Sequence, residues 1–261
     1  MKQAFTLLAA TTALAACSTT SMPERAPGAS FYERQEVVIE AANSLVVAGP
    51  FEVSVNASAS EPELILFGPP EMIADTRVVV KDGTLSIGFV DGARWGWNPG
   101  AGMHASVSLP ALQSVATKGS GSVDVYGVKT ETFGAATGGS GSITVKRLEA
   151  NTFQAATGGS GSITVDNLSA KAVQLATGGS GSIHIHGKAE SASIGTAGSG
   201  SIDAKRLRVE TADIGVSGSG SVYADVTRTA QIAVLGSGRV DVVGGAQCTV
   251  PPSHKPKVEC R

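Results

Sequence analysis

His184 and His186 are the side chains whose type and spacing come nearest to a metal site. They lie two positions apart in an alternating apolar and polar run, so on a strand both imidazoles point to the same face. One repeat later, we expect Asp203 beside His184 and Lys205 beside His186. Two imidazoles and a carboxylate can ligate zinc or copper, but the lysine would repel the cation. These residues are therefore only weak metal candidates, and we expect no cofactor.

A second group, Arg94, Trp95, Trp97 and Asn98, lies in a glycine-containing stretch between two predicted strands. Exposed tryptophans stack on sugar rings, and the arginine and asparagine would supply hydrogen bonds, so this loop is the candidate ligand-binding site. The alternative, which loop tryptophans adopt more often, is that both pack down over the protein as a lid.

The N-terminus has the pattern of a targeting segment and is left out of the fold. Lys2 precedes a short apolar run, residues 5–14, which leads into the sequence LAAC at Cys17. This sequence resembles a bacterial lipobox, which implies a signal peptide over residues 1–16 and lipidation of Cys17. An ordinary secretory signal followed by a coincidental cysteine is the alternative. Residues 17–30, rich in serine, threonine and proline, are expected to form a flexible tether.

The two remaining cysteines, Cys248 and Cys260, lie close together near the C-terminus. In an oxidising periplasm or at the cell surface, a disulfide between them is the expected state. Closing so short a loop stabilises a fold by about 3 kcal/mol in the chain-entropy description. A metal would need further ligands, and only His254 lies nearby.

The elements that position these residues come mainly from one repeated motif, Gly-Ser-Gly. Its copies begin at Gly119, Gly139, Gly159, Gly179, Gly198, Gly218 and Gly236. Repeats of about 20 residues, rich in Gly, Ser, Thr and Val, are too short for helix pairs and predict an all-β chain that stacks as a parallel β-solenoid.

Alternation within each repeat predicts which side chains face inward. Ile143 and Val145 and their equivalents would enter the tube after the glycines, and a threonine would enter before them. These threonines are Thr117, Thr137, Thr157, Thr177 and Thr196. Two strands per coil would form a flattened tube with two sheets. We expect the stacked hydroxyls to satisfy one another, and the corner glycines to supply positive φ angles.

The ends of such a stack need caps, because exposed edge strands pair with other chains. Residues 31–110 show short strand patterns separated by glycine, proline and asparagine, and are expected to cover one end of the 111–245 repeats. Residues 246–261 are expected to form a disulfide-closed hairpin over the other end.

Several function classes are disfavoured by composition and by register. A net charge of −2 lacks the basic footprint of a nucleic-acid binder. A glycine-rich calcium roll needs a carboxylate where this chain has Ile143, so calcium has no ligand there. Polysaccharide lyases need clustered carboxylates and a nearby base, whereas the outward acids here are spread over distant repeats.

Several separate motifs resemble the putative auto-transporter adhesin, head GIN domain family. They are GPFEVSV at residues 49–55, VKDGTLSI at 80–87, VSLPAL at 107–112 leading into the first Gly-Ser-Gly, and the terminal CTV and VEC at 248–250 and 258–260. The resemblance covers about residues 35–260. It implies a pectin-lyase-like, right-handed β-helix and a role in adhesion that rests on fold analogy. No catalytic residue comes with it.

The sequence therefore favours a non-catalytic lipoprotein that binds a glycan or a protein. Ser18 after the lipidated cysteine favours an outer-membrane anchor, facing either the periplasm or the cell surface. A structural or assembly role is the alternative, because one outward column consists of Ala and Gly and would suit a second copy of the chain or the N-terminal strands as a cover. A bare sheet face is the simpler explanation of that column. A polysaccharide-active enzyme is a third and weaker hypothesis.

Overall fold

The computed structural model describes residues 32–93, 102–252 and 257–261, which belong to one compact unit. The strands are β1 (Glu33–Val37), β2 (Ser44–Val47), β3 (Phe51–Asn56), β4 (Glu63–Gly68), β5 (Thr76–Lys81), β6 (Thr84–Phe89), β7 (Met103–Ser108), β8 (Ser114–Thr117), β9 (Ser122–Tyr126), β10 (Val128–Thr137), β11 (Ser142–Val145), β12 (Leu148–Thr157), β13 (Ser162–Ser169), β14 (Ala172–Thr177), β15 (Ser182–Gly198), β16 (Ser201–Gly218), β17 (Ser221–Gly236), β18 (Arg239–Val243), β19 (Gln247–Thr249) and β20 (Val258–Cys260). One short helix, α1 (Pro70–Ala74), joins β4 to β5.

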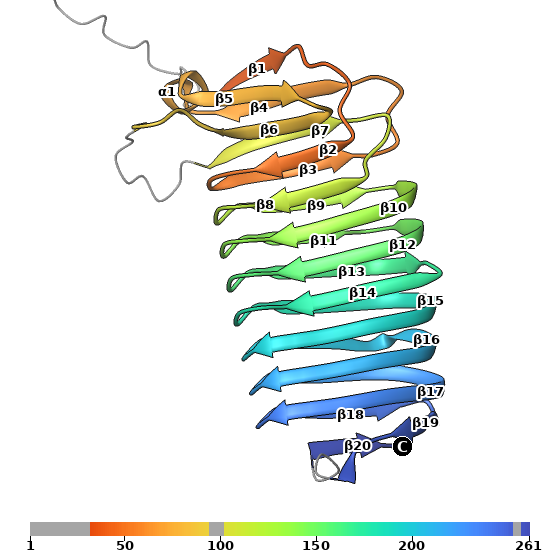
Figure 1. Ribbon diagram of the computed structural model, residues 1–261. Coiled ribbons are helices and arrows are strands. Elements are labelled where there is room, and N and C mark those ends of the chain that lie inside the picture. The colour runs from red at the N-terminus through yellow and green to blue at the C-terminus, as the bar shows by residue number, and fades with distance from the viewer. Residues whose placement is uncertain (1–31, 94–101, 253–256) are drawn as a thin grey trace, which may run out of the picture. The chain divides into compact units, whose positions relative to one another are not determined.

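The repeats stack as a parallel β-solenoid, as predicted (Figure 1). Ile143 pairs with Ile163 and Ile163 with Ile183, which confirms a coil of about 20 residues. Branched side chains suit this pattern because they pack well on a pleated surface. Their columns are fully buried along the axis of the stack and form one continuous core.

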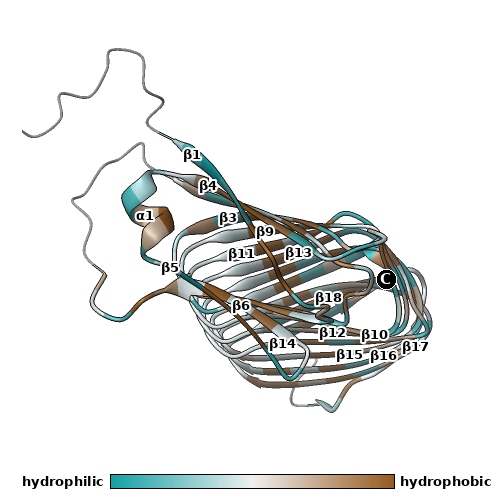
Figure 2. Ribbon diagram, turned by 90° about the horizontal axis from the view of Figure 1, so that it is seen from above, coloured by the Kyte–Doolittle hydropathy of each residue, from teal (hydrophilic) through white to brown (hydrophobic). Residues whose placement is uncertain are grey.

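Each coil has a third short segment, so the prediction of two sheets was incomplete. Val128–Thr130 at the start of β10 pairs in parallel with Leu148–Ala150 at the start of β12, separately from the later part of each strand. Val128, Leu148 and Leu168 point inward from this segment and are buried. The alternation predicted inward positions only on the two strands that flank each corner, so it did not assign these residues. A coil of 20 residues is long enough to include a third segment. Figure 2 looks down the stack and shows the coils superposed.

The corner glycines are required mostly for close approach between coils. A Cβ at Gly179 would lie 2.6 Å from the carbonyl oxygen of Gly159, and one at Gly181 would lie 2.5 Å from that of Gly161. Positive φ, which we expected at every corner, occurs at Gly198, Gly218 and Gly236 but not at the earlier repeat corners. Gly198, Gly218 and Gly236 therefore allow both the close approach between coils and the positive φ angle.

The five predicted threonines are buried, but their hydroxyls do not satisfy one another as expected. The oxygens of Thr117, Thr137, Thr157, Thr177 and Thr196 are enclosed and have no hydrogen-bond partner. Each hydroxyl lies against the second glycine of the next Gly-Ser-Gly corner instead of against the next threonine. The Thr157 oxygen, for example, lies 2.9 Å from where a Cβ on Gly181 would be.

The N-terminal end does not stack in chain order. The first coil, β2 and β3, lies between the coil of β6 and β7 and the coil of β8 and β9, and pairs in parallel with both (Figure 1). Beyond it, β4 pairs antiparallel with β7, β1 antiparallel with β4, and β5 antiparallel with β6. These strands cover the end of the stack, as predicted, and the parallel solenoid thus extends into the 31–110 region.

The C-terminal segment continues the solenoid and does not fold into the expected hairpin. Strand β19 pairs in parallel with β17, and β20 pairs in parallel with β18. The predicted disulfide between Cys248 and Cys260 is present and joins these two strands. Since β19 and β20 pair with different strands and not with each other, the disulfide is the covalent link that closes this last coil.

Candidate functional site

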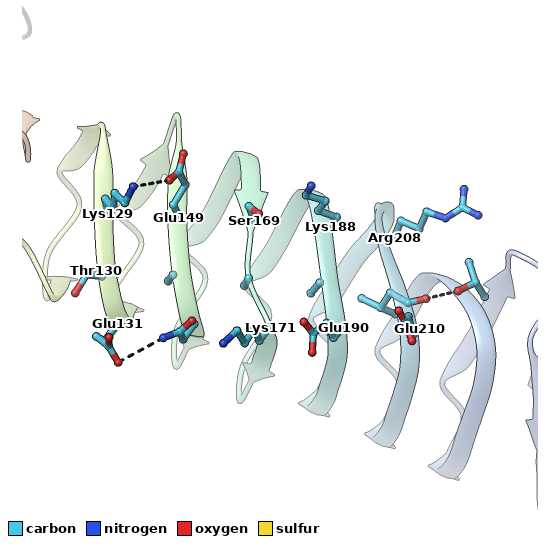
Figure 3. A pocket seen from close by; sticks show the side chains of 16 residues that line it. Lys129, Thr130, Glu131, Glu149, Ser169, Lys171, Lys188, Glu190, Arg208 and Glu210 are labelled. Atoms are coloured by element: carbon cyan, nitrogen blue, oxygen red, sulfur yellow. Dashed lines mark hydrogen bonds and ion pairs between the residues drawn. The ribbon is translucent and has the colours of Figure 1, made fainter.

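A groove with a volume of about 980 Å³ runs over the third segment of the coils. We call it the charged groove. It is lined by Lys129, Thr130, Glu131, Glu149, Ala150, Asn151, Ser169, Ala170, Lys171, Lys188, Ala189, Glu190, Arg208, Val209, Glu210 and Thr227. Figure 3 shows these side chains on successive coils, so the groove follows the axis of the stack.

Two walls and a floor build this groove, because the same three positions of each coil stack in register. The first wall is Lys129, Glu149, Ser169, Lys188 and Arg208, and the second is Glu131, Asn151, Lys171, Glu190 and Glu210 (Figure 3). The positions between the walls hold Thr130, Ala150, Ala170, Ala189 and Val209. Small residues between long ones leave the depression.

Ion pairs and a hydrogen bond engage the charged side chains at both ends of the groove. Lys129 lies 3.5 Å from Glu149, and Asn151 donates to Glu131 at 3.4 Å. At the far end, Arg228 lies 3.0 Å from Glu210. Between them, Lys171, Lys188, Glu190 and Arg208 are exposed and form no salt bridge with any described residue.

A second surface is the predicted column of small residues, which we call the small-residue face. Ala116, Ala136, Ala156, Ala176, Gly195, Gly215 and Ala233 lie in register on the outside of the coils. Three shallow depressions of about 590, 570 and 500 Å³ follow it, and Leu235 beside them is 63% exposed. The described N-terminal strands, one expected cover, extend the sheets at the end of the stack instead.

The neighbours of the weak metal candidates, His184 and His186, agree only in part with the prediction. Asp203 pairs with His184 as expected, but the ladder shifts by one residue after that pair, so His186 faces Arg206 and not Lys205. No group of three or more His, Cys, Asp or Glu side chains in the described ranges is arranged to hold a metal ion.

Other outward charges on this sheet pair with one another. Lys146 lies 2.9 Å from Asp166, whose hydrogen bond and negative charge raise the pKa of Lys146. Asp241, which is buried, contacts Lys205 at 3.2 Å and Arg261 at 3.3 Å. These ion pairs contrast with the unpaired charges in the middle of the charged groove.

The other predicted sites fall on parts of the chain that the structure does not describe. Cys17, Arg94, Trp95, Trp97 and Asn98 all lie outside the described residues. The charged groove, in turn, was not predicted from the sequence. Its signal was present as alternating charged residues at equivalent repeat positions, such as Lys188–Glu190 and Arg208–Glu210, once the third segment of the coil is recognised.

The fold and its outward surfaces define an elongated β-solenoid of adhesin type. The chain belongs to the putative auto-transporter adhesin, head GIN domain family, whose model matches residues 42–246, as the sequence motifs indicated. No helix among the described residues is long and apolar enough to cross a membrane. The family points to the cell envelope or surface.

Crystal structures of several bacterial proteins share this fold. A putative adhesin from Parabacteroides merdae has a TM-score of 0.78 at 17% identity, covering 89% of this chain and 95% of its own. A putative lipid binding protein and a putative adhesin, both from Parabacteroides distasonis, each have a TM-score of 0.77, at 20% and 18% identity. Each of these two covers 88% of this chain and 94% of its own. Among curated proteins, no sequence matches this chain.

Proposed function

We propose that this chain is a non-catalytic, lipid-anchored module of the cell envelope that holds an extended ligand in the charged groove. The observation that carries the proposal is the groove itself, about 980 Å³ in volume and built from equivalent positions of successive coils. A groove along a stack suits a linear polymer, because each coil offers it one further set of contacts. Membership of an adhesin family supports a role in attachment.

The polar groups of the groove favour binding over catalysis. General acid–base catalysis needs two groups within reach of one reacting bond. The four carboxylates that line the groove lie on four different coils, and three of them already have side-chain partners. Histidine, cysteine and tyrosine are absent from the lining residues.

The binding role is tested by blocking the groove. Ser169 stands in the middle of the first wall, so Ser169→Trp is expected to fill the groove and to abolish binding of the labelled protein to an array of glycans and extracellular proteins. Ser193→Trp, an outward serine on the small-residue face, is the matched control and should leave this binding unchanged. Equal binding by wild type and Ser169→Trp would contradict the proposal. Trp95→Ala and Trp97→Ala separate a contribution of the tryptophan loop from that of the groove.

The anchor is tested on Cys17. Metabolic labelling with a fatty acid analogue should mark the wild-type chain and not Cys17→Ser, and the labelled chain should fractionate with the outer membrane. Protease treatment of intact cells then reports orientation, since only a surface-facing chain is cleaved. An unlabelled wild-type chain would rule out the lipid anchor.

A second candidate function, assembly of the envelope, rests on the small-residue face. Side chains of this size let another surface approach closely, and the exposed Leu235 adds apolar area. Sedimentation of the full chain is expected to show an oligomer that Ser193→Trp dissociates and Ser169→Trp leaves intact. A wild-type monomer at all concentrations would exclude this candidate for self-assembly.

A further inference from the structure

We propose that the middle of the charged groove binds the acidic groups of a linear polysaccharide that carries one acidic group on each sugar, through Lys171, Lys188 and Arg208. This inference rests on the proposed function, because it names the ligand class of the same groove.

The middle of the charged groove carries more positive than negative charge. In the middle of the groove, Lys171, Lys188 and Arg208 set three positive charges against the single negative charge of Glu190, and none of the four forms a salt bridge with a described residue. At the ends of the groove, Lys129 pairs with Glu149 and Arg228 pairs with Glu210, whereas Glu131 keeps its negative charge. The whole sequence carries a net charge of −2. Positive charge is therefore a local property of this site, and it favours an anionic ligand.

The three cations of the groove lie on successive coils. Lys188 and Arg208 are direct partners in neighbouring strands β15 and β16, where like charges repel. A ligand that places one anion at each of them would relieve this repulsion. Lys171 stands one coil earlier on the opposite wall, so the three cations follow the groove one coil at a time, about 4.8 Å apart along its axis.

The coil spacing separates the polymers that could supply such anions. Acidic side chains on one face of an extended peptide recur every second residue, about 6.8 Å apart, which does not fit the coil spacing. Single-stranded nucleic acids need aromatic platforms for their bases, and none of the lining residues is aromatic. A hexose in a linear chain is close to one coil spacing in length, and successive sugars turn about the chain axis. Acidic groups on successive sugars can therefore meet the opposite walls that carry Lys171 and Lys188.

The polar side chains of the groove can also form hydrogen bonds with a sugar. Hydroxyl groups of the polymer can donate to Glu190 and exchange hydrogen bonds with Ser169, which lies on the coil of Lys171, and with Asn151 one coil earlier. The fork of Arg208 matches a carboxylate or a sulfate, and lysine acts as a point charge. The shared chemistry is thus an oxyanion on each sugar.

The test measures binding of the full chain to polygalacturonate, to fully methyl-esterified polygalacturonate and to dextran sulfate by calorimetry. We expect binding to an acidic polymer that weakens as salt is raised, and at least about a tenfold loss in the double variant Lys188→Gln/Arg208→Gln. The double variant Arg77→Gln/Lys118→Gln removes the same charge from exposed positions elsewhere and should bind like wild type. Preference for polygalacturonate would identify a carboxylate as the ligand group, and preference for dextran sulfate a sulfate.

Four results would overturn the inference. They are equal binding of the methyl-esterified polymer, unchanged binding by Lys188→Gln/Arg208→Gln, tighter binding of poly-L-glutamate, and no binding of any acidic polysaccharide. If Ser169→Trp still abolishes attachment on the array in such a case, the binding function of the groove stands and only its ligand class is wrong. Thermal unfolding of each variant verifies that the exposed substitutions leave the fold intact.

Discussion

In the repeats, strands that follow one another in the chain also follow one another in the stack, whereas in the N-terminal region they do not. Thr137 pairs with Thr157, the equivalent residue of the next coil. Leu45, by contrast, pairs with Leu85 on one side and with Val115 on the other. The first coil of the chain is therefore complete only after two much later segments have been placed. Stability is local in the repeats and long-range at the N-terminal end.

The largest expected difference between the two regions comes from Phe51→Ala and Phe153→Ala. Both rings are fully buried, so each truncation should cost about 3–5 kcal/mol of unfolding free energy. Phe51 of the inserted coil stacks on Phe89 of the adjacent coil, with ring centroids 4.5 Å apart, while Phe153 stacks on Phe133 in the preceding repeat. Phe51→Ala should therefore raise amide exchange in β6 and β7 as well as in β8 and β9. Phe153→Ala should raise it in β10 and β14.

Hydrogen exchange with proteolytic fragments measures this pattern, and denaturant unfolding measures the free energies. If Phe51→Ala loosened only β2 and β3 and left β6 to β9 protected, the N-terminal end would be as local as the repeats, and the contrast between the regions would fail.

The next largest effect extends the comparison to the two ends of the stack. Antiparallel strands close the N-terminal end, whereas Cys248 and Cys260 close the C-terminal one across a sequence separation of 12 residues. The double variant Cys248→Ser/Cys260→Ser should lose about 3 kcal/mol in the last coil. Exchange should rise in β17 to β20 and remain unchanged in β1 to β7. Loss of protection along the whole chain would show that the solenoid unfolds as one cooperative unit.

Prediction from sequence succeeds in the same places where contacts are local. The period of the Gly-Ser-Gly motif and the alternation of residues such as Ile163 and Val165 were sufficient for the coil, its core and the threonine column, because each repeat contacts its own copies. The disulfide followed from two nearby cysteines. The inserted position of β2 and β3 could not be predicted, because nothing in residues 44–56 distinguishes pairing with β6 from pairing with β8 alone.

The candidate site was missed for a different physical reason. The groove depends on a third direction within each coil, and period-two counting treats residues 128–132 as a continuation of one strand. The alternation alone therefore does not single out Lys188 and Glu190. The change of chain direction at the third segment places Lys188 and Glu190 on opposite walls of the groove, with Ala189 between them.

A smaller effect separates two kinds of glycine inside the repeats. A Cβ at Gly181 would lie 2.5 Å from the Gly161 oxygen, so Gly181→Ala should cost about 1–3 kcal/mol by overpacking. A Cβ at Gly195, on the small-residue face, would meet nothing within 4 Å, so Gly195→Ala should gain about 0.5–1 kcal/mol. Neither residue has a positive φ, which makes them matched controls. Equal destabilisation in denaturant titrations would show that the corner imposes no special packing.

The smallest effect concerns the threonine column. Thr157 is buried and its hydroxyl has no hydrogen-bond partner, so Thr157→Val should raise the unfolding free energy by about 1 kcal/mol. The chain itself provides the precedent, because Val216 and Val234 continue the same column after Thr196. Thr157→Ser, which keeps the hydroxyl and loses the methyl group, is the control and should destabilise. Thermal and denaturant unfolding of the three proteins decides the sign. If Thr157→Val were less stable than wild type, the hydroxyls would have to bond within the column after all, and the repeats would depend on a polar ladder as well as on their aliphatic core.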